Sequence, residues 1–351
     1  MRQPPAYDHP LRVVRFEDLQ RGERSPIILT RMPDSTPLAS TLGKLFRSNV
    51  FLLLITAVFC LPVTSFSQQE KPTGDDQTTL RVDVDLVNVL FTVTEGNRLV
   101  PNLAKEDFIV EEDGRPQQIS HFSREVTLPL TLAILIDTSP SVEPVLELEK
   151  QTAVEFLQAV LRKKDLALVM NFDRSVSLLQ DFTSDIRRLT KAIQSVSIGG
   201  GTSVHDAVFL ACDEKLKQET GRKAIILVSD GGDTTSKLKI KEALEAAQRA
   251  DVIIYAISNR AGSMLFRGGG DDGTLKKYAE ATGGKAFFPS KPQDFKKAFD
   301  AIQEELRSQY ILSYTSSNSL KDGGYRSIRI SAPNQKNLKV RAKKGYYAAK
   351  S

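Results

Sequence analysis

The middle of the chain alternates unbroken apolar runs with stretches whose apolar residues recur at helical spacing. Four runs lack the polar alternation of a half-exposed strand, at residues 130–136, 166–172, 224–228 and 252–257. Such runs are typical of parallel strands buried on both faces. Helical spacing of apolar residues occurs between and after them, at residues 146–161, 186–193, 238–247 and 295–306. This order predicts an α/β fold with a doubly wound, mostly parallel sheet.

The flanking sequence has a different period. Residues 82–93 alternate apolar and polar side chains up to the turn signal at 95–97, which predicts a strand. Residues 108–111 and 119–122 flank Asp113-Gly114, and this pattern predicts a hairpin between them. The N-terminal flank is therefore expected to be a β structure, and it is too short to bury much surface alone.

The C-terminal flank supplies further strands, predicted at residues 309–315, 325–331 and 337–341. We expect residues 80–126 and 309–349 to build one small β-sandwich, into which the α/β domain of residues 127–308 is inserted. Two separate small β units are the alternative arrangement.

The N-terminal 67 residues are typical of an export leader. Lys44 and Arg47 precede the apolar run 50–63, which is shorter than the roughly 20 residues of a membrane span. Small residues follow, and cleavage is expected after Ser67, with residues 68–79 as a linker and Met32 as an alternative start. An extracytoplasmic protein, periplasmic or secreted, is predicted. The alternative is an uncleaved anchor in the inner membrane through residues 50–63.

Charge and cysteine content change this picture little. Cleavage would remove eight basic and five acidic residues, so the net charge would fall from +5 to +2, and nucleic acid is not an expected partner. The basic residues of 339–343 are interpreted as the solvated face of a strand. Lipidation of Cys60 is disfavoured because the bulky Phe59 precedes it. Cys212 would then be the only cysteine, in a buried structural role, and no spacing indicates zinc.

Polar oxygen donors gather where predicted strands end. Asp137, Ser139 and Ser141 follow the first apolar run, Thr202 follows three glycines before a helical stretch, and Asp230 follows the run 224–228. The carboxyl ends of strands in an open α/β sheet form the crevice where ligands bind. Carboxylate and hydroxyl oxygens suit magnesium or calcium better than zinc.

This three-part pattern resembles the metal-ion-dependent adhesion site of the von Willebrand factor A family, over roughly residues 127–308. The resemblance implies that Ser139, Ser141 and Thr202 offer hydroxyl oxygens to the ion, while Asp137 and Asp230 coordinate it directly or through water. Further segments resemble a bacterial VWFA-related family first described in acidobacteria, namely Asp107-Phe108, Glu112-Asp113-Gly114, Leu306 to Tyr310 and Lys344 to Tyr347.

The resemblance implies an exported, non-catalytic protein-binding module for adhesion or envelope assembly. Its cofactor would be Mg²⁺, or Ca²⁺ or Mn²⁺. Two carboxylates only neutralise a divalent ion, so a coordination position held by water stays open for the Asp or Glu side chain of a protein ligand. A metal-dependent hydrolase or phosphotransferase is the alternative, although Asp137 lacks the second acid two residues on that aspartate-nucleophile phosphatases show. A scaffold with a structural ion is a third reading.

Ser203, His205 and Asp233 are expected at the rim of this site. Catalysis by Ser203, His205 and Asp206 is disfavoured, because consecutive residues at a helix start rarely align as nucleophile, base and orienting acid. Asp206 is expected in the first turn of that helix. Asp233 is also a candidate N-cap for the helix 238–247. The glycine-rich loop 260–273 lacks the lysine and hydroxyl residue of a phosphate loop.

Overall fold

The fold is taken from a computed structural model, which describes residues 86–124, 128–260, 271–291, 293–335 and 337–350. The predicted leader, its cleavage site and the linker lie outside the described residues. So do the start of the predicted first strand and residues 261–270 of the glycine-rich loop. No helix in the described part of the chain is long and apolar enough to span a membrane.

The predicted α/β fold is confirmed. Its sheet has the strand order β11-β10-β9-β6-β7-β8, and all neighbours are parallel except the edge pair of β7 and β8. Every residue of the central strand β6 is buried, as its unbroken apolar run predicts. The strands are β6 (Leu130–Asp137), β7 (Leu166–Phe172), β8 (Val176–Thr183), β9 (Arg222–Val228), β10 (Ile253–Ile257) and β11 (Ala286–Phe287).

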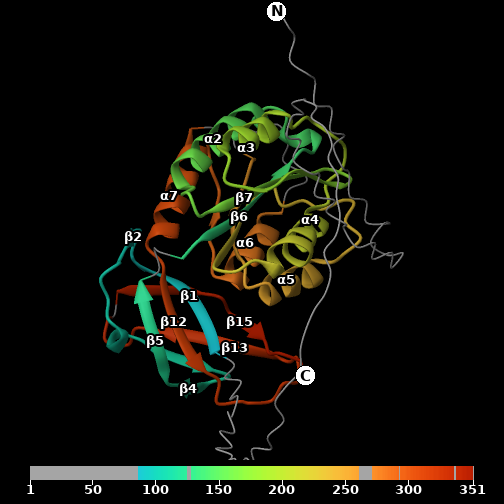
Figure 1. The fold of residues 1–351 in the computed structure, drawn as a ribbon. Helices are drawn as coiled ribbons and strands as arrows, with labels where there is room; N and C mark the ends of the chain where they lie inside the picture. Colours follow the sequence, from blue (N-terminus) through green and yellow to red (C-terminus); the bar gives the residue numbers. More distant parts are fainter. Residues whose placement is uncertain (1–85, 125–127, 261–270, 292, 336, 351) are drawn as a thin grey trace, which may run out of the picture. The chain divides into compact units, whose positions relative to one another are not determined.

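Helices cover both faces of this sheet (Figure 1). One face packs against α2 (Leu146–Val160), α3 (Ile186–Gln194) and α7 (Asp294–Arg307). The other packs against α4 (Val204–Leu210), α5 (Ile240–Arg249) and α6 (Asp272–Thr282). Shorter helical segments are η1 (Lys105–Asp107), η2 (Pro140–Val142), the π-helical η3 (Ala211–Lys215) and η4 (Leu216–Gln218).

Cys212 lies in η3 and is fully buried, in keeping with its expected structural role. Burial raises the pKa of its thiol well above the ordinary value. A thiol that stays protonated is a poor nucleophile and a poor metal ligand. Cys212 therefore acts here as a small apolar residue of the core.

Two antiparallel sheets form the β part, with strands from both flanks in each. One has the order β14-β1-β12-β5, with β2 beside β1, and the other has the order β15-β13-β3-β4. The α/β part is thus inserted between strands that pair with one another. The strands are β1 (Leu86–Glu95), β2 (Arg98–Leu99), β3 (Ile109–Glu112), β4 (Arg115–Gln117), β5 (Ile119–Arg124), β12 (Tyr310–Thr315), β13 (Tyr325–Ser331), β14 (Leu338–Ala342) and β15 (Gly345–Tyr347).

The predicted hairpin has the expected turn but a different second strand. Asp113 and Gly114 have φ angles of 47° and 76°, as a two-residue hairpin turn with two positive φ angles requires. This turn places Glu112 opposite Arg115, so β3 pairs with β4. Residues 119–122 were expected to pair with β3. They lie too far beyond the turn to do so, and β5 joins β12 in the other sheet.

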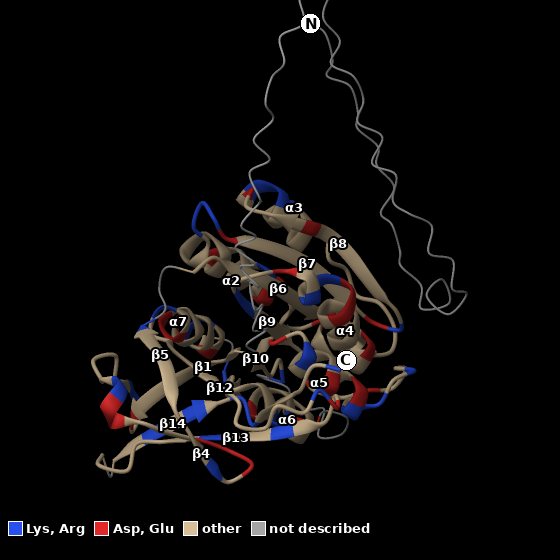
Figure 2. Ribbon diagram, turned by 60° about the horizontal axis from the view of Figure 1, so that its bottom comes forward, with Lys and Arg blue, Asp and Glu red and all other residues tan. Residues whose placement is uncertain are grey.

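The interpretation of residues 339–343 as a solvated basic face is wrong for two of its side chains. Arg341 donates to the carboxylate of Glu305 in α7, and Lys343 Nζ lies 2.7 Å from Asp251 Oδ1. The side chains of Arg341 and Lys343 are only 27% and 11% exposed. Arg341 of β14 (Figure 2) and Lys343 just after it therefore bind carboxylates of the α/β part, which a strand pattern cannot reveal.

Arg222, at the start of β9, contacts the chain near both places where it passes between the β part and the α/β part. Its guanidinium donates to the carbonyl of Leu128 at 3.3 Å and to the carbonyl of Leu306 at 2.5 Å. Leu128 lies two residues before β6, the first strand of the α/β part, and Leu306 lies in the last turn of α7. Since Arg222 is buried, these carbonyls satisfy a charge that would otherwise be costly.

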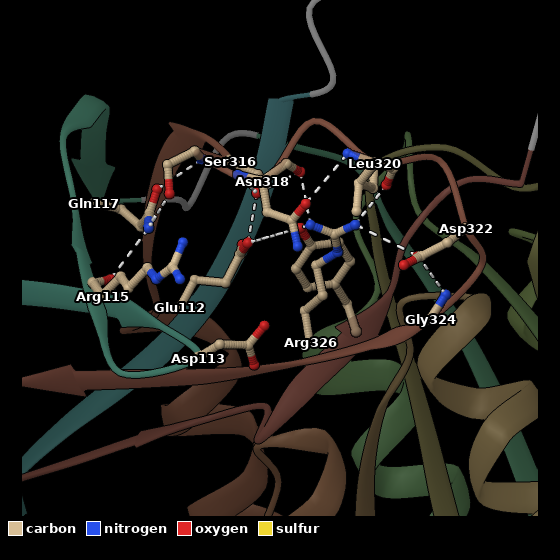
Figure 3. Close-up of polar contacts among 12 residues, drawn as sticks. Glu112, Asp113, Arg115, Gln117, Ser316, Asn318, Leu320, Asp322, Gly324 and Arg326 are labelled. Atoms are coloured by element: carbon tan, nitrogen blue, oxygen red, sulfur yellow. Dashed lines mark hydrogen bonds and ion pairs between the residues drawn. The ribbon is translucent and has the colours of Figure 1, made fainter.

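A buried charged network joins the two sheets of the β part (Figure 3). Glu112 of β3 and Arg326 of β13 are each 2% exposed and lie 3.8 Å apart. Arg326 also donates to the carbonyls of Asn318 and Leu320. Glu112 accepts from the hydroxyls of Tyr314, Ser316 and Tyr346. Both charges are therefore fully compensated within the core.

We expect Glu112→Ala to lower the free energy of unfolding by about 3–5 kcal/mol, because Arg326 would lose its buried carboxylate partner and keep only the exposed carboxylate of Asp322. Urea unfolding measures the change. The matched control is Glu95→Ala, which removes the exposed ion pair between Glu95 and Arg98 and should cost less than about 1 kcal/mol. Equal losses in the two variants would contradict a stabilising role for the buried network.

Candidate metal centre

The predicted site lies where the order of the strands reverses. The chain runs from β6 outward to β7 and β8, then crosses to the other side of β6 and continues as β9, β10 and β11. Asp137 is the last residue of β6, and Asp230 follows the neighbouring strand β9 by two residues. The carboxyl ends of adjacent strands at such a reversal leave a crevice. Both predicted carboxylates therefore lie at the same edge of the sheet.

Three predicted ligands are in direct contact through their oxygen atoms. Ser139 Oγ lies 3.0 Å from Ser141 Oγ, and Ser141 Oγ donates to Asp230 Oδ2 over 3.4 Å. Ser139 and Ser141 are two residues apart, at the start of η2, so their side chains reach the same place. The structure thus brings together residues that lie 89 positions apart in the chain.

Asp137 is fully buried and is held by hydrogen bonds on both carboxylate oxygens. Oδ1 accepts from the Ser139 amide at 2.8 Å, and Oδ2 accepts from Ser229 Oγ at 2.7 Å. Burial raises the pKa of Asp137 to about 6, and the nearby charge of Asp230 adds a smaller rise, against the lowering effect of these hydrogen bonds. No role was predicted for Ser229, and its place just before Asp230 is the only signal for it in the sequence.

Backbone hydrogen bonds hold Thr202 between the other two segments. The Gly199 amide donates to the carbonyl of Thr138, beside Asp137, at 2.8 Å. Gly201 has a φ of +81°, which favours glycine, and the chain then turns into Thr202. The Thr202 carbonyl accepts from the amides of Thr234 and Thr235, in the loop after Asp230. The Thr202 loop is therefore tied to the ends of both β6 and β9.

The predicted rim residues have different surroundings. Ser203 is 1% exposed, and its hydroxyl has no hydrogen-bond partner among the described residues, so it lies beneath the surface rather than on a rim. His205 Nδ1 lies 2.9 Å from the hydroxyl of Tyr278. Burial lowers the pKa of His205, although Asp233 and Asp206 oppose this effect. A neutral imidazole is therefore favoured.

Asp233 was expected to cap the helix that follows it, but it does not. Helix α5 begins at Ile240, with Lys239 at its N-cap position. Asp233 Oδ2 instead accepts from Ser236 Oγ at 2.5 Å and from the His205 amide at 3.1 Å. The loop after β9 folds back over the start of α4, so Asp233 satisfies an amide in the first turn of that earlier helix.

Asp206 lies in the first turn of α4, as expected, and serves the same loop. Its carboxylate accepts from the amides of Lys237 and Leu238 at 3.0 Å. The His205 and Asp206 side chains therefore bond to other groups, and the Ser203 hydroxyl has no partner among the described residues. This arrangement does not favour nucleophilic catalysis by the three residues.

The residues present fit a small cation with oxygen ligands. In the described part of the chain, no group of three or more His, Cys, Asp or Glu side chains is placed to hold a metal ion. A cation here would therefore depend on hydroxyl oxygens beside the two carboxylates. The contacts of Ser139, Ser141 and Asp230 supply such oxygens at one point. This donor set suits hard cations.

Residues 132–232 match the family model described as the von Willebrand factor type A domain. This part of the chain is a von Willebrand factor type A domain. The resemblance that the sequence motifs indicate is thus confirmed at the level of the domain. A comparison of the whole sequence with curated proteins finds no match.

Solved structures with this fold come from several organisms. BatB from Bacteroides thetaiotaomicron is 20% identical, with a TM-score of 0.42, over 51% of this chain and 100% of that one. The von Willebrand factor domain of the type V pili tip protein Mfa5 from Porphyromonas gingivalis is 15% identical, with a TM-score of 0.39, over 51% and 95% of the two chains. Proximal thread matrix protein 1 of the mussel byssus, with a zinc-occupied adhesion-site motif, is 17% identical, with a TM-score of 0.45, over 56% and 49%.

We expect Asp137→Asn to stabilise the metal-free protein at pH 7. The pKa of Asp137 rises from 3.8 to about 6 on folding, so ionisation between these values costs the folded state up to about 3 kcal/mol by pH 7. The gain should shrink toward zero as the pH falls to about 4, where the wild-type carboxyl is protonated. Urea unfolding with chelator at both pH values measures it. The same gain at both pH values would show that the burial of charge is not its cause.

Proposed function

We propose that Asp137, Ser139, Ser141, Thr202 and Asp230 hold one divalent cation, Mg²⁺ or alternatively Ca²⁺ or Mn²⁺. The observation that carries this proposal is the contact of the Ser139, Ser141 and Asp230 oxygens at the strand reversal. Two carboxylate charges neutralise the ion and the hydroxyls add none. Magnesium prefers six oxygen ligands and usually keeps some water. A coordination position therefore stays open to an anionic group.

The function that this site supports best is metal-dependent capture of a protein ligand through an Asp or Glu side chain. A carboxylate from the partner would replace one water on the ion. His205 and Asp233 would line the approach, and Ser203, which was also expected there, lies below the surface. The hydrogen bonds of His205 and Asp206 do not favour the alternative, a hydrolase or phosphotransferase. We therefore propose a binding role without catalysis.

We further propose that the protein works outside the cytoplasm, in adhesion or envelope assembly. The support is the leader of residues 1–67, which precedes the described part of the chain. The domain plan of residues 80–126, 127–308 and 309–349 belongs to this proposal, as does the resemblance to the bacterial VWFA-related family. The binding domain would then be displayed on a β part that both flanks build.

Titration calorimetry with Mn²⁺ tests the cation site. We expect one ion per chain, and Thr202→Ala should weaken its affinity about 10-fold or more because one oxygen ligand is lost. The matched control is Thr315→Ala, which removes an exposed hydroxyl at the end of β12 and should leave the affinity unchanged. Wild-type affinity in Thr202→Ala, or no uptake by the wild type, would refute the proposed ligand set.

Affinity capture from a native envelope extract tests the binding function. The wild-type protein should retain proteins that are lost with chelator and with Thr202→Ala, but kept with Thr315→Ala. The reason is that the partner's carboxylate would bind the ion itself. Identical sets of retained proteins in all four samples would rule out capture through the cation.

Cation affinity should fall as the pH decreases below about 6. The metal-free pKa of Asp137 is about 6, and a proton on this carboxyl competes with the cation, so each further pH unit should weaken binding about tenfold. Titration calorimetry at pH 5, 6 and 7 measures the slope. An affinity that stays constant over this range would show that Asp137 does not need to ionise for the ion to bind.

A further inference from the structure

A second buried carboxyl lies behind the candidate metal centre. Glu149, in the first turn of α2, is 2% exposed, and neither of its carboxylate oxygens has a hydrogen-bond partner in the described part of the chain. A buried charge without partners is costly. Sequence analysis did not single out Glu149, because an acidic residue in the first turn of a helix is ordinary.

The group that faces this carboxyl is the side-chain amide of Asn259, just after β10. Asn259 is 3% exposed, and its Oδ1 and Nδ2 atoms also lack hydrogen-bond partners among the described residues. The amide lies close enough to lower the pKa of Glu149, although the two groups are not aligned as a geometric hydrogen bond. Two buried polar groups without partners among the described residues thus lie near each other inside the protein.

The surroundings of Glu149 favour its neutral form. Burial raises its pKa well above the ordinary value, and the negative charge of Asp137 raises it further. The neighbouring cation on α2, Lys150, does not compensate it, because Lys150 Nζ lies 2.7 Å from Glu147 Oε1. Among the described residues, Glu149 makes no hydrogen bond to any of the five proposed cation ligands.

We propose that Glu149 carries a proton and forms a neutral, reciprocal pair with Asn259. The Glu149 hydroxyl donates to Asn259 Oδ1, and Asn259 Nδ2 donates to the other Glu149 oxygen. This pair satisfies all four orphan atoms at once. An ionised Glu149 could accept from Nδ2 but would leave Asn259 Oδ1 without a donor. The Glu149 carboxyl takes this proton from solvent and retains it when the chain folds.

The pair makes Glu149 a positioning residue for the site. The backbone amide of Asn259 donates to the Ser229 carbonyl at 3.4 Å, and the Ser229 hydroxyl donates to Asp137. The pair therefore fixes the loop after β10 against Ser229, the residue that orients Asp137.

The neutral pair also has an electrostatic consequence, which rests on the proposed function. A neutral Glu149 keeps the carboxylate charge near the ion at two, so that a bound divalent cation can still attract an acidic ligand.

The decisive experiment compares wild type with Glu149→Gln in the absence of metal, so it does not depend on cation binding. Glutamine keeps the size of the side chain and can form the same reciprocal pair, but it cannot ionise. If folded Glu149 stays protonated, only the unfolded wild type loses this proton above about pH 4.5. The wild-type folding equilibrium constant, relative to that of Glu149→Gln, should then fall about tenfold per pH unit between pH 5 and 6.

Urea unfolding at these pH values measures this ratio, and the ionisation of Asp137 cancels because both proteins contain it. A ratio that does not change with pH would show that Glu149 is ionised in the folded state and would overturn the proposal. Infrared spectra at pH 7 give a second reading that does not require the Gln variant to be stable. Wild type should show the carbonyl band of a protonated carboxyl, and Asn259→Ala should shift or abolish that band. A wild-type spectrum without the band would also overturn the pair.

Cation affinity gives a separate test of the electrostatic consequence. Glu149→Gln should bind Mn²⁺ with wild-type affinity, since neither side chain is charged at pH 7. A change of about tenfold or more would refute this consequence alone. Absence of Mn²⁺ uptake by wild type would refute the proposed function and leave the acid–amide pair standing on the metal-free measurements.

Discussion

The candidate site depends on one topological constraint, the pairing of β6 with β9 in the centre of the sheet. Because the strand order reverses there, the carboxyl ends of both strands open onto the same crevice. The loops after β6, before α4 and after β9 are then tied together by backbone hydrogen bonds, from Gly199 to Thr138 and from Thr234 to Thr202. Without this strand order, the carboxylates of Asp137 and Asp230 would not open onto the same crevice and could not form one site.

In the absence of a bound cation, the polar groups at this edge of the sheet make folding less favourable. Asp137 is a buried carboxyl whose pKa rises to about 6, and Ser203, Glu149 and Asn259 have buried atoms without partners among the described residues. The buried charges of Glu112 and Arg326 in the β part, by contrast, are compensated. Departures from such compensation concentrate where a protein binds something. A cation at the strand reversal would offset the carboxylate charge that folding buries there.

The β part is built from both flanks of the α/β part. Its two sheets combine strands from both flanks, so neither flank can form them without the other. Arg222 binds the carbonyls of Leu128 and Leu306, where the chain enters and leaves the α/β part. Arg341 of β14 and Lys343 just after it add ion pairs to Glu305 and Asp251. These contacts give the inserted domain a fixed support.

The sequence by itself determined the fold class, the main buried strands and helices, and the five candidate ligands. A strand that is buried on both faces has an unbroken apolar sequence, such as that of β6. The polar residues at its end are also local signals. Only the tertiary structure decided which distant groups meet. The partner of β5, the ion pairs of Arg341, the turn of Asp233 toward α4 and the facing of Glu149 and Asn259 all depend on how separate segments pack. No local period in the sequence records such contacts.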